Sequence, residues 1–305
     1  MTDKKGLTTF QLKVFACLVM VIDHVSAIFM PFYDPMDSST WPWAFALNND
    51  ILRGIGRLAL PIFAFLIAEG CRHTRSLPRY CGRLFGFAVL SMVPYCFALF
   101  SQNLYTPRLV GDPSWYDEFL GTPPIWFFPD HVGNVLFSLA IGAAAVWLWN
   151  TLRPRIRGLV WIVLALYYAA SLVIGIAFSV EYAEIIVPLV LGLYLLRSRR
   201  AQCLWLAAVM IVYYLGFAEW NGMGLAWVQR LEQLWGDPQL WDALLSAGFL
   251  YTAWACLAVI PVALYNGMPG KTGKWVKWVK WGFYLFYPVH LLVLGGIREL
   301  LLLLA

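Results

Sequence analysis

Long apolar runs, separated by short polar segments, recur along all 305 residues. A run of about twenty apolar residues crosses about 30 Å of hydrocarbon when helical. An open strand edge could not satisfy its backbone in lipid, so each run is predicted to be a helix. The pattern predicts an all-α, polytopic integral membrane bundle of about nine transmembrane helices: Lys13–Phe32, Ile51–Cys71, Cys81–Ser101, Val132–Leu152, Gly158–Phe178, a short Glu184–Leu196, Cys203–Glu219, Ala243–Asn266 and Trp281–Leu304.

Basic residues occupy alternate connections, as expected on the cytoplasmic side of a membrane. They follow the N-terminal Lys4 and Lys5 and comprise Arg72, Arg75, Arg79 and Arg83; Arg153, Arg155 and Arg157; Arg197, Arg199 and Arg200; and Lys271, Lys274, Lys277 and Lys280. The intervening connections carry most of the acidic residues. We therefore predict a cytoplasmic N-terminus. The net charge of +5 follows from this topology and gives no reason to expect a nucleic acid partner.

The composition agrees with a membrane protein, since 61% of the residues are hydrophobic and only 13% are charged. We expect one transmembrane domain over residues 1–305 and a retained first helix rather than a cleaved signal peptide. The outer connections 102–130 and 220–242 are rich in Trp, Tyr, Pro and Gly. They are expected at the membrane interface, either as lids over a site or as anchors of the bundle.

Asp23 and His24 interrupt the first apolar run, in the stretch MVIDHVSAIFMP. A charged side chain near the bilayer centre costs about 2.5–3.5 kcal/mol on insertion scales, which favours a functional interpretation. His24 follows Lys13 by a rise of roughly 17 Å, which places it beyond the middle of the membrane. Consecutive helical residues point about 100° apart, so Asp23 and His24 are predicted to have different partners.

The second apolar run carries Arg53 and Arg57, and Pro61 is predicted to kink it because proline cannot bond the Arg57 carbonyl. We expect Arg57, the deeper of the two, to pair with Asp23 or with a ligand, while the position of Arg53 suits a side chain that extends to the membrane interface. Arg72, Arg75, Arg79 and Arg83 would form one stripe if the helix continued past Pro78, which is predicted to start a new helix instead. They are either ordinary cytoplasmic charges or an anion site in which Glu69 orients a phosphate-binding arginine.

The last apolar run carries Tyr287 and His290 on one helical face, at a depth similar to that of His24. Neither helix offers a second histidine or a set of carboxylates, so no metal is expected.

Four stretches resemble the signature blocks of the TraX family, named for an F-pilin N-terminal acetylase. They are LKVFACLVMVIDHVSAIFMP, LRGIGRLALPIFAFLIAEGCRHTR, NVLFSLAIG and FYLFYPVHLLVL, and they occur in family order over nearly the whole chain. Lys13 and His24 are also similar in spacing to an Arg and His pair of larger membrane acyltransferases. The chain departs from the family at SVEYAEI, where an acidic-Tyr-Gly stretch is usual, and this departure concerns the outer loop.

The resemblance implies a bacterial, multi-pass cell membrane acetyltransferase. Cytoplasmic acetyl-CoA would dock on Lys13, Glu69, Arg72, Arg75, Arg79 and Arg83, and an amine or hydroxyl acceptor would enter from outside. Neutral His24 would act as general base, with an acetyl-histidine intermediate as a variant. Asp23 would hold Arg57 or orient the acceptor, while Tyr287, His290 or Asn134 would stabilise the oxyanion.

A proton-coupled transporter is the rival hypothesis, because kinked helices with buried Asp, Arg and His also serve carriers. The second half of the chain shows no visible repeat of the first, which counts against it. A lipid-binding scaffold would leave the buried charges unexplained.

Overall fold

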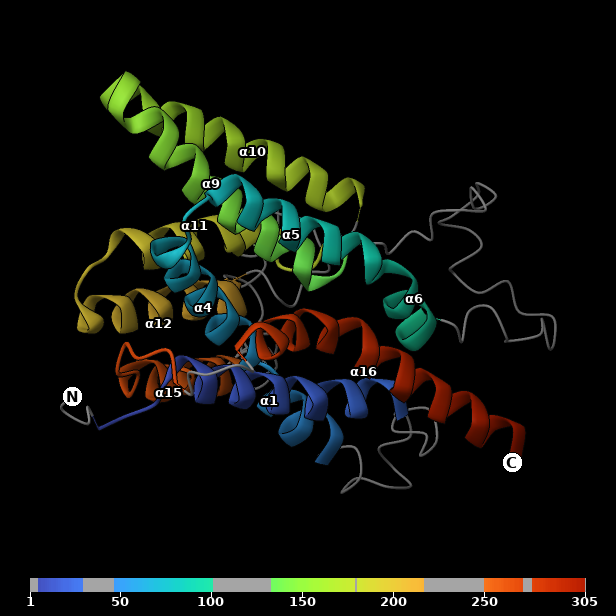
Figure 1. The fold of residues 1–305 in the computed structure, drawn as a ribbon. Helices are drawn as coiled ribbons and strands as arrows, with labels where there is room; N and C mark the ends of the chain where they lie inside the picture. Colours follow the sequence, from blue (N-terminus) through green and yellow to red (C-terminus); the bar gives the residue numbers. More distant parts are fainter. Residues whose placement is uncertain are drawn as a thin grey trace, which may run out of the picture.

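A computed structural model describes residues 5–29, 47–100, 133–178, 180–216, 250–270 and 276–304. Within these ranges the chain is helical and contains no strand, apart from a single bridge between Leu7 and Tyr265 (Figure 1). The all-α prediction is therefore confirmed. The two predicted lids, 102–130 and 220–242, lie outside the described residues.

The predicted spans correspond to helices, several of which are broken. The continuous ones are α1 (Thr9–Phe29), α9 (Val135–Ile156), α10 (Val160–Ala177), α11 (Ala183–Leu195), α12 (Arg199–Gly216) and α16 (Val276–Leu304). The second span consists of η2 (Leu47–Leu52), α3 (Arg53–Gly56) and α4 (Ala59–His73). The third consists of α5 (Leu77–Leu90) and α6 (Met92–Phe100), and the eighth is the helix Leu250–Ala263, whose last part is α15 (Val259–Ala263).

Four stretches are long and apolar enough to cross a membrane: Thr9–Phe29, Arg53–His73, Val135–Gly175 and Trp281–Leu301. The pair α5 and α6, bent by 41°, would make a fifth. The stretch Val135–Gly175 contains α9 and α10, which are joined by η3 (Arg157–Leu159) and fold back on each other in Figure 1. The helices are those of a membrane protein, while the count of nine complete spans stays a prediction.

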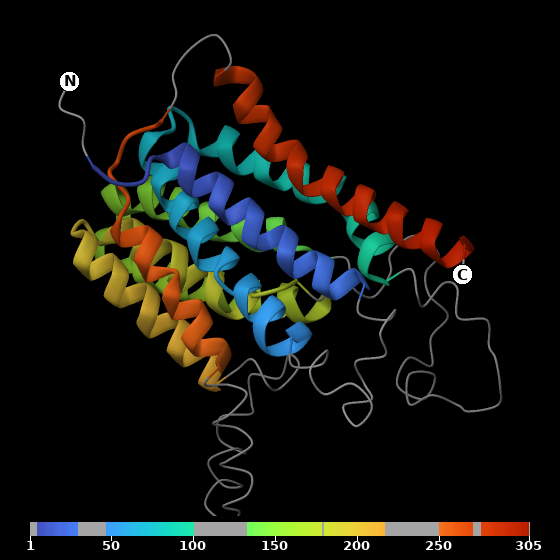
Figure 2. The same cartoon turned by 90° about the horizontal axis from the view of Figure 1, so that it is seen from below.

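Helix α4 forms the centre of the bundle. In the stretch Arg53–His73, which contains α4, 78% of the most apolar 18 residues are buried, against 22–39% in the other three membrane-length stretches. It packs against α1, α9, α11 and α15, and Figure 2 shows α1 lying between α4 and α16. Outward-facing apolar side chains, such as Leu166 on α10 and Val293 on α16, suit contact with lipid. Polar groups carried by α1, α4 and α11 are thereby held inside the bundle.

Near Pro61, where a kink was predicted, the α-helix is interrupted one turn ahead of the proline, between α3 and α4. The backbone N–H groups of Arg57 and Leu58 donate three residues back, to Gly54 and Ile55, at 2.9 and 3.1 Å. These are 3₁₀-type turns, which rotate more per residue than an α-helix does. Pro78 lies in the first turn of α5, as predicted.

A second break, at Ser91 between α5 and α6, was not predicted. Pro94 lacks the N–H that would bond the Leu90 carbonyl, and the Ser91 hydroxyl donates to the Phe87 carbonyl at 2.6 Å. Both features weaken the regular helix at this point.

Candidate functional site

Asp23 and His24 contact different helices, as predicted from their positions on α1. Asp23 Oδ1 accepts a hydrogen bond from Arg53 Nη1 at 2.7 Å, which forms an ion pair between α1 and α3. His24 Nδ1 lies 2.6 Å from Nε2 of His290 on α16. Helix α1 therefore contributes one side chain to an ion pair and the next to an imidazole pair.

The hydrogen bonds of the imidazole pair fix its tautomers. His290 Nδ1 lies 2.8 Å from the Phe286 carbonyl, which can only accept, so Nδ1 carries the hydrogen. In a neutral His290 ring Nε2 is then an acceptor, and His24 Nδ1 must donate to it. The hydrogen of a neutral His24 is thus on Nδ1, and Nε2 keeps its lone pair. Among the described residues, Nε2 of His24 makes no hydrogen bond.

Tyr287 packs edge-on against both imidazoles, with ring centroids 6.1 Å from His24 and 5.6 Å from His290. Tyr287 is 4% exposed, and within the described ranges its hydroxyl has no hydrogen-bond partner of normal geometry, although the backbone N–H of Val135 lies close by. The hydroxyl is thus an available donor beside the histidine pair.

Asn134 has a structural position at the start of α9. Its side-chain oxygen accepts from the Leu136 N–H at 3.1 Å, and its amide donates to the Ala88 carbonyl at 2.9 Å. It is the N-cap of α9 and ties this helix to α5. Because both ends of the side chain are engaged, it is a poorer oxyanion donor than Tyr287.

The predicted pairing of Arg57 with Asp23 is wrong, because Arg53 forms that ion pair. The 3₁₀ turn at Arg57 rotates its side chain away from the face that it would share with Arg53 in a regular helix. Gly56 lies directly against Asp23, which leaves no room there for another side chain. Arg57 instead donates from Nη1 to the Tyr182 hydroxyl at 3.2 Å.

Glu181 and Tyr95 also line this region and were not identified as site residues from the sequence. Tyr95 donates to Glu181 at 2.6 Å, and the charges of Asp23, Arg53 and Arg57 are close enough to influence the same carboxyl. Burial raises the pKa of Glu181 above its ordinary value, while the hydrogen bond from Tyr95 lowers it. The available signal was an acidic residue between two apolar runs, in SVEYAEI.

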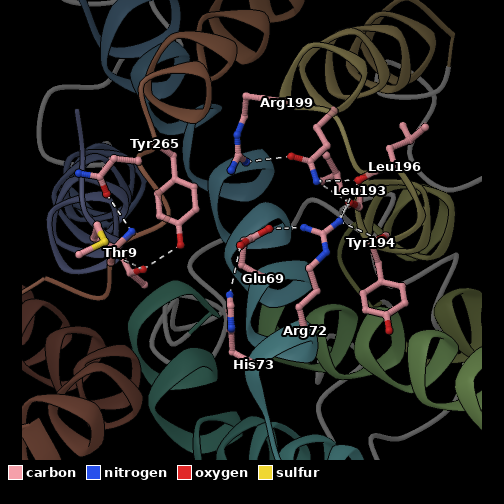
Figure 3. A network of polar contacts seen from close by, with 12 residues as sticks. Thr9, Glu69, Arg72, His73, Leu193, Tyr194, Leu196, Arg199 and Tyr265 are labelled. Carbon is pink, nitrogen blue, oxygen red and sulfur yellow. Dashed lines mark hydrogen bonds and ion pairs between the residues drawn. The ribbon is translucent and has the colours of Figure 1, made fainter. Parts of the chain in front are cut away.

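Glu69 and Arg72 form a closed network at the end of the bundle where α1 begins, which we call the basic end (Figure 3). The Arg72 guanidinium pairs with Glu69 and donates to the carbonyls of Leu193, Tyr194 and Leu196 at 2.6–2.9 Å. These carbonyls belong to the last turn of α11. Arg72 therefore caps α11 and has little capacity left for a phosphate.

The turn after α4 separates Arg72 from the arginines of the next helix, as the predicted helix start at Pro78 implies. Arg75 and Arg79 are exposed, while Arg83 lies against the Tyr80 ring with its Nε buried and unpaired. Lys13 lies on the same end of the bundle, 5.3 Å from the Phe283 ring centroid. The continuous stripe is absent, and Arg75 and Arg79 are the two of the four that are open to solvent.

The fold is that of a helical membrane protein, and its polar residues form two candidate sites, a histidine pair among buried charges and the exposed Arg75 and Arg79 at the basic end. The chain belongs to the TraX protein family, whose model matches residues 9–298. It is 27% identical over 306 residues to the probable fimbrial assembly protein FimC, serogroup H1, of Dichelobacter nodosus, which covers 99% of this chain and 100% of that protein. No solved structure matches the chain.

Proposed function

We propose that this protein is a multi-pass acetyltransferase of a bacterial cell membrane. It moves an acetyl group from cytoplasmic acetyl-CoA to an amine or hydroxyl acceptor reached from the opposite side. The basic end, with the N-terminus, faces the cytoplasm. Membership of the TraX family supports the activity, and the similarity to a probable fimbrial assembly protein of D. nodosus supports a fimbrial subunit as an acceptor class.

The observation that carries the proposal is the hydrogen-bonded series from the Phe286 carbonyl through His290 to His24. It leaves His24 Nε2 as a base held in a fixed orientation. During transfer Nε2 takes a proton from the acceptor while the acceptor nitrogen or oxygen attacks the thioester carbonyl carbon. The carbon–sulfur bond then breaks, and the imidazolium returns the proton to the departing CoA thiolate.

Other buried groups support the same step. The unpaired Tyr287 hydroxyl beside the histidines is suited to donate to the oxyanion of the tetrahedral intermediate. The Asp23 and Arg53 pair holds α1 against α3, which maintains the position of His24. At the basic end, exposed Arg75 and Arg79 are suited to the phosphates of CoA.

Calorimetric binding of acetyl-CoA to the detergent-purified protein tests the donor assignment. The expected result is binding that weakens about tenfold or more when Arg75 is changed to Ala or when the 3′-phosphate of CoA is removed. Arg200→Ala, which removes another exposed arginine of the basic end, is the matched control. If the folded wild-type protein does not bind acetyl-CoA, the donor assignment fails and transport assays become the next step.

A further inference from the structure

Arg57 is a charged side chain of the bundle that forms no ion pair within the described residues, although the charges of Asp23 and Glu181 are close enough to interact with it. Asp23 is bonded to Arg53, and Glu181 is bonded to Tyr95. Within the described part of the chain, Arg57 forms no ion pair, and its Nε is buried without a hydrogen-bond partner. A buried, unpaired charge is costly, which makes this position unusual for a purely structural arginine.

Tyrosines surround the Arg57 guanidinium. Its central carbon lies 4.8 Å from the Tyr251 ring centroid and 6.0 Å from that of Tyr214, and Nη1 donates to Tyr182. These contacts hold the guanidinium in one orientation and partly offset the cost of its burial. The Nε–H group of Arg57 makes none of these contacts. In bidentate pairs, arginine commonly uses Nε together with one terminal nitrogen to bind a carboxylate.

Tyr214 supplies a second unpaired donor in the same place. Tyr214 is only 2% exposed, and its buried hydroxyl has no hydrogen-bond partner among the described residues. Two buried groups that can both donate, one of them cationic, lack an acceptor within the same cluster. An anionic oxygen group would satisfy both of them.

We infer that Arg57 and Tyr214 form a recognition site for an anionic oxygen group, a carboxylate or a phosphate, on the acceptor. This inference rests on the proposed function for the identity of the ligand as acceptor. Arg57 lies in the turn that directly follows α3, and Arg53, the first residue of α3, bonds to Asp23, which is the chain neighbour of His24. An anion bound by Arg57 would therefore anchor an acceptor whose nucleophile reaches His24.

Thermal unfolding of the detergent-purified protein with sodium acetate, acetamide or sodium phosphate tests the site at constant ionic strength. Acetate or phosphate is expected to raise the unfolding temperature with increasing concentration, as mass action requires, and acetamide is not. The anion with the larger effect identifies the chemical class. Arg57→Gln is expected to abolish the effect, and Tyr214→Phe to weaken apparent binding about tenfold.

Tyr213→Phe is the matched control, since Tyr213 contacts the Tyr182 and Tyr214 rings without lying over the guanidinium. His24→Ala is expected to keep the anion effect, so failure of the catalytic proposal and failure of this site can be distinguished. The inference is overturned if neither anion stabilises the wild-type protein, or if the effect persists in Arg57→Gln. If Arg57→Gln does not fold, an anion effect of wild-type size in Tyr214→Phe overturns it.

Discussion

At the scale of single residues, the proposed chemistry rests on the histidine pair, His24 and His290. A base within a hydrophobic bundle needs both a lone pair and a fixed orientation, and each depends here on a bond made by another residue. The Phe286 carbonyl sets the tautomer of His290, and His290 sets that of His24. In the proposed mechanism His290 is accordingly a positioning residue.

Substitution of His290 tests this positioning role. His290→Gln replaces the accepting ring nitrogen Nε2 with an amide oxygen that can accept from His24 Nδ1, whereas His290→Leu leaves no acceptor. We expect His290→Leu to lower kcat for acetyl transfer about tenfold to a hundredfold, and His290→Gln to recover part of the loss. KM for acetyl-CoA should change little in both, because His290 lies far along α16 from the basic end. An equal loss of kcat in His290→Leu and His290→Gln would contradict the positioning role of His290.

The buried Glu181 carboxyl predicts a dependence of stability on pH. Its pKa is raised by burial and by the Asp23 charge, and lowered by Tyr95, Arg53 and Arg57. A carboxyl whose pKa is higher in the folded than in the unfolded state contributes stability that is lost as the pH rises through the folded-state pKa. Glu181→Gln should therefore stabilise the protein more at about pH 8 than at about pH 5, as measured by thermal unfolding in detergent. An equal effect of Glu181→Gln on the unfolding temperature at the two pH values would show that folding does not raise the pKa of Glu181.

At the scale of elements, the breaks in the helices determine which charged residues meet. The 3₁₀ turn between α3 and α4 sends Arg53 to Asp23 and Arg57 to the tyrosines. Gly56 permits the close approach of α1 at this turn, because a Cβ atom there would overlap the Asp23 side chain.

Gly56→Ala is expected to force α1 away from α3 and to destabilise the protein by about 1–3 kcal/mol. Gly82 on α5 is the matched control, since a Cβ there meets nothing within 4 Å. Gly82→Ala should be neutral or stabilise by up to about 1 kcal/mol, because alanine favours a helix. Thermal unfolding of the two purified variants measures the difference. Equal stability of both would mean that the contact with Asp23 is not tight.

The sequence predicted the positions of the helices better than it predicted which side chains pair with one another. Apolar runs located the helices, Pro61 and Pro78 located two discontinuities, and helical periodicity required separate partners for Asp23 and His24. The Arg57 pairing was wrong because a 3₁₀ turn changes side-chain direction without leaving a clear sequence pattern. Glu181 was missed because its importance depends on Tyr95, which lies 86 positions away in the chain.

At the scale of the whole molecule, the two candidate sites lie at different depths of one bundle. The N-terminal segment joins residues 264–268 at the basic end, where Leu7 and Leu264 share a backbone hydrogen bond of 2.8 Å. The turns after α4 and α11 lie there too, tied together by Arg72. The histidine pair is about three helical turns along α1 from Lys13. A cytoplasmic donor and an outer acceptor would thus approach from opposite sides.

Labelling with a membrane-impermeant maleimide tests this orientation in a variant without native cysteines. Ser76→Cys and Ser198→Cys mark the basic end, and Phe178→Cys marks the end of α10. In intact cells only Phe178→Cys should react, and all three should react after permeabilisation. Reaction of Ser76→Cys in intact cells would contradict a cytoplasmic basic end.

The most direct measurement is the release of CoA from acetyl-CoA by the purified protein in proteoliposomes, with primary amines as acceptors. The wild-type protein should release CoA in an acceptor-dependent way, and His24→Ala should slow this release by about 10²–10⁴-fold. His73→Ala is the control, because that side chain is 72% exposed at the basic end, and it should match the wild type. Wild-type turnover by folded His24→Ala would contradict the assignment of His24 as the base.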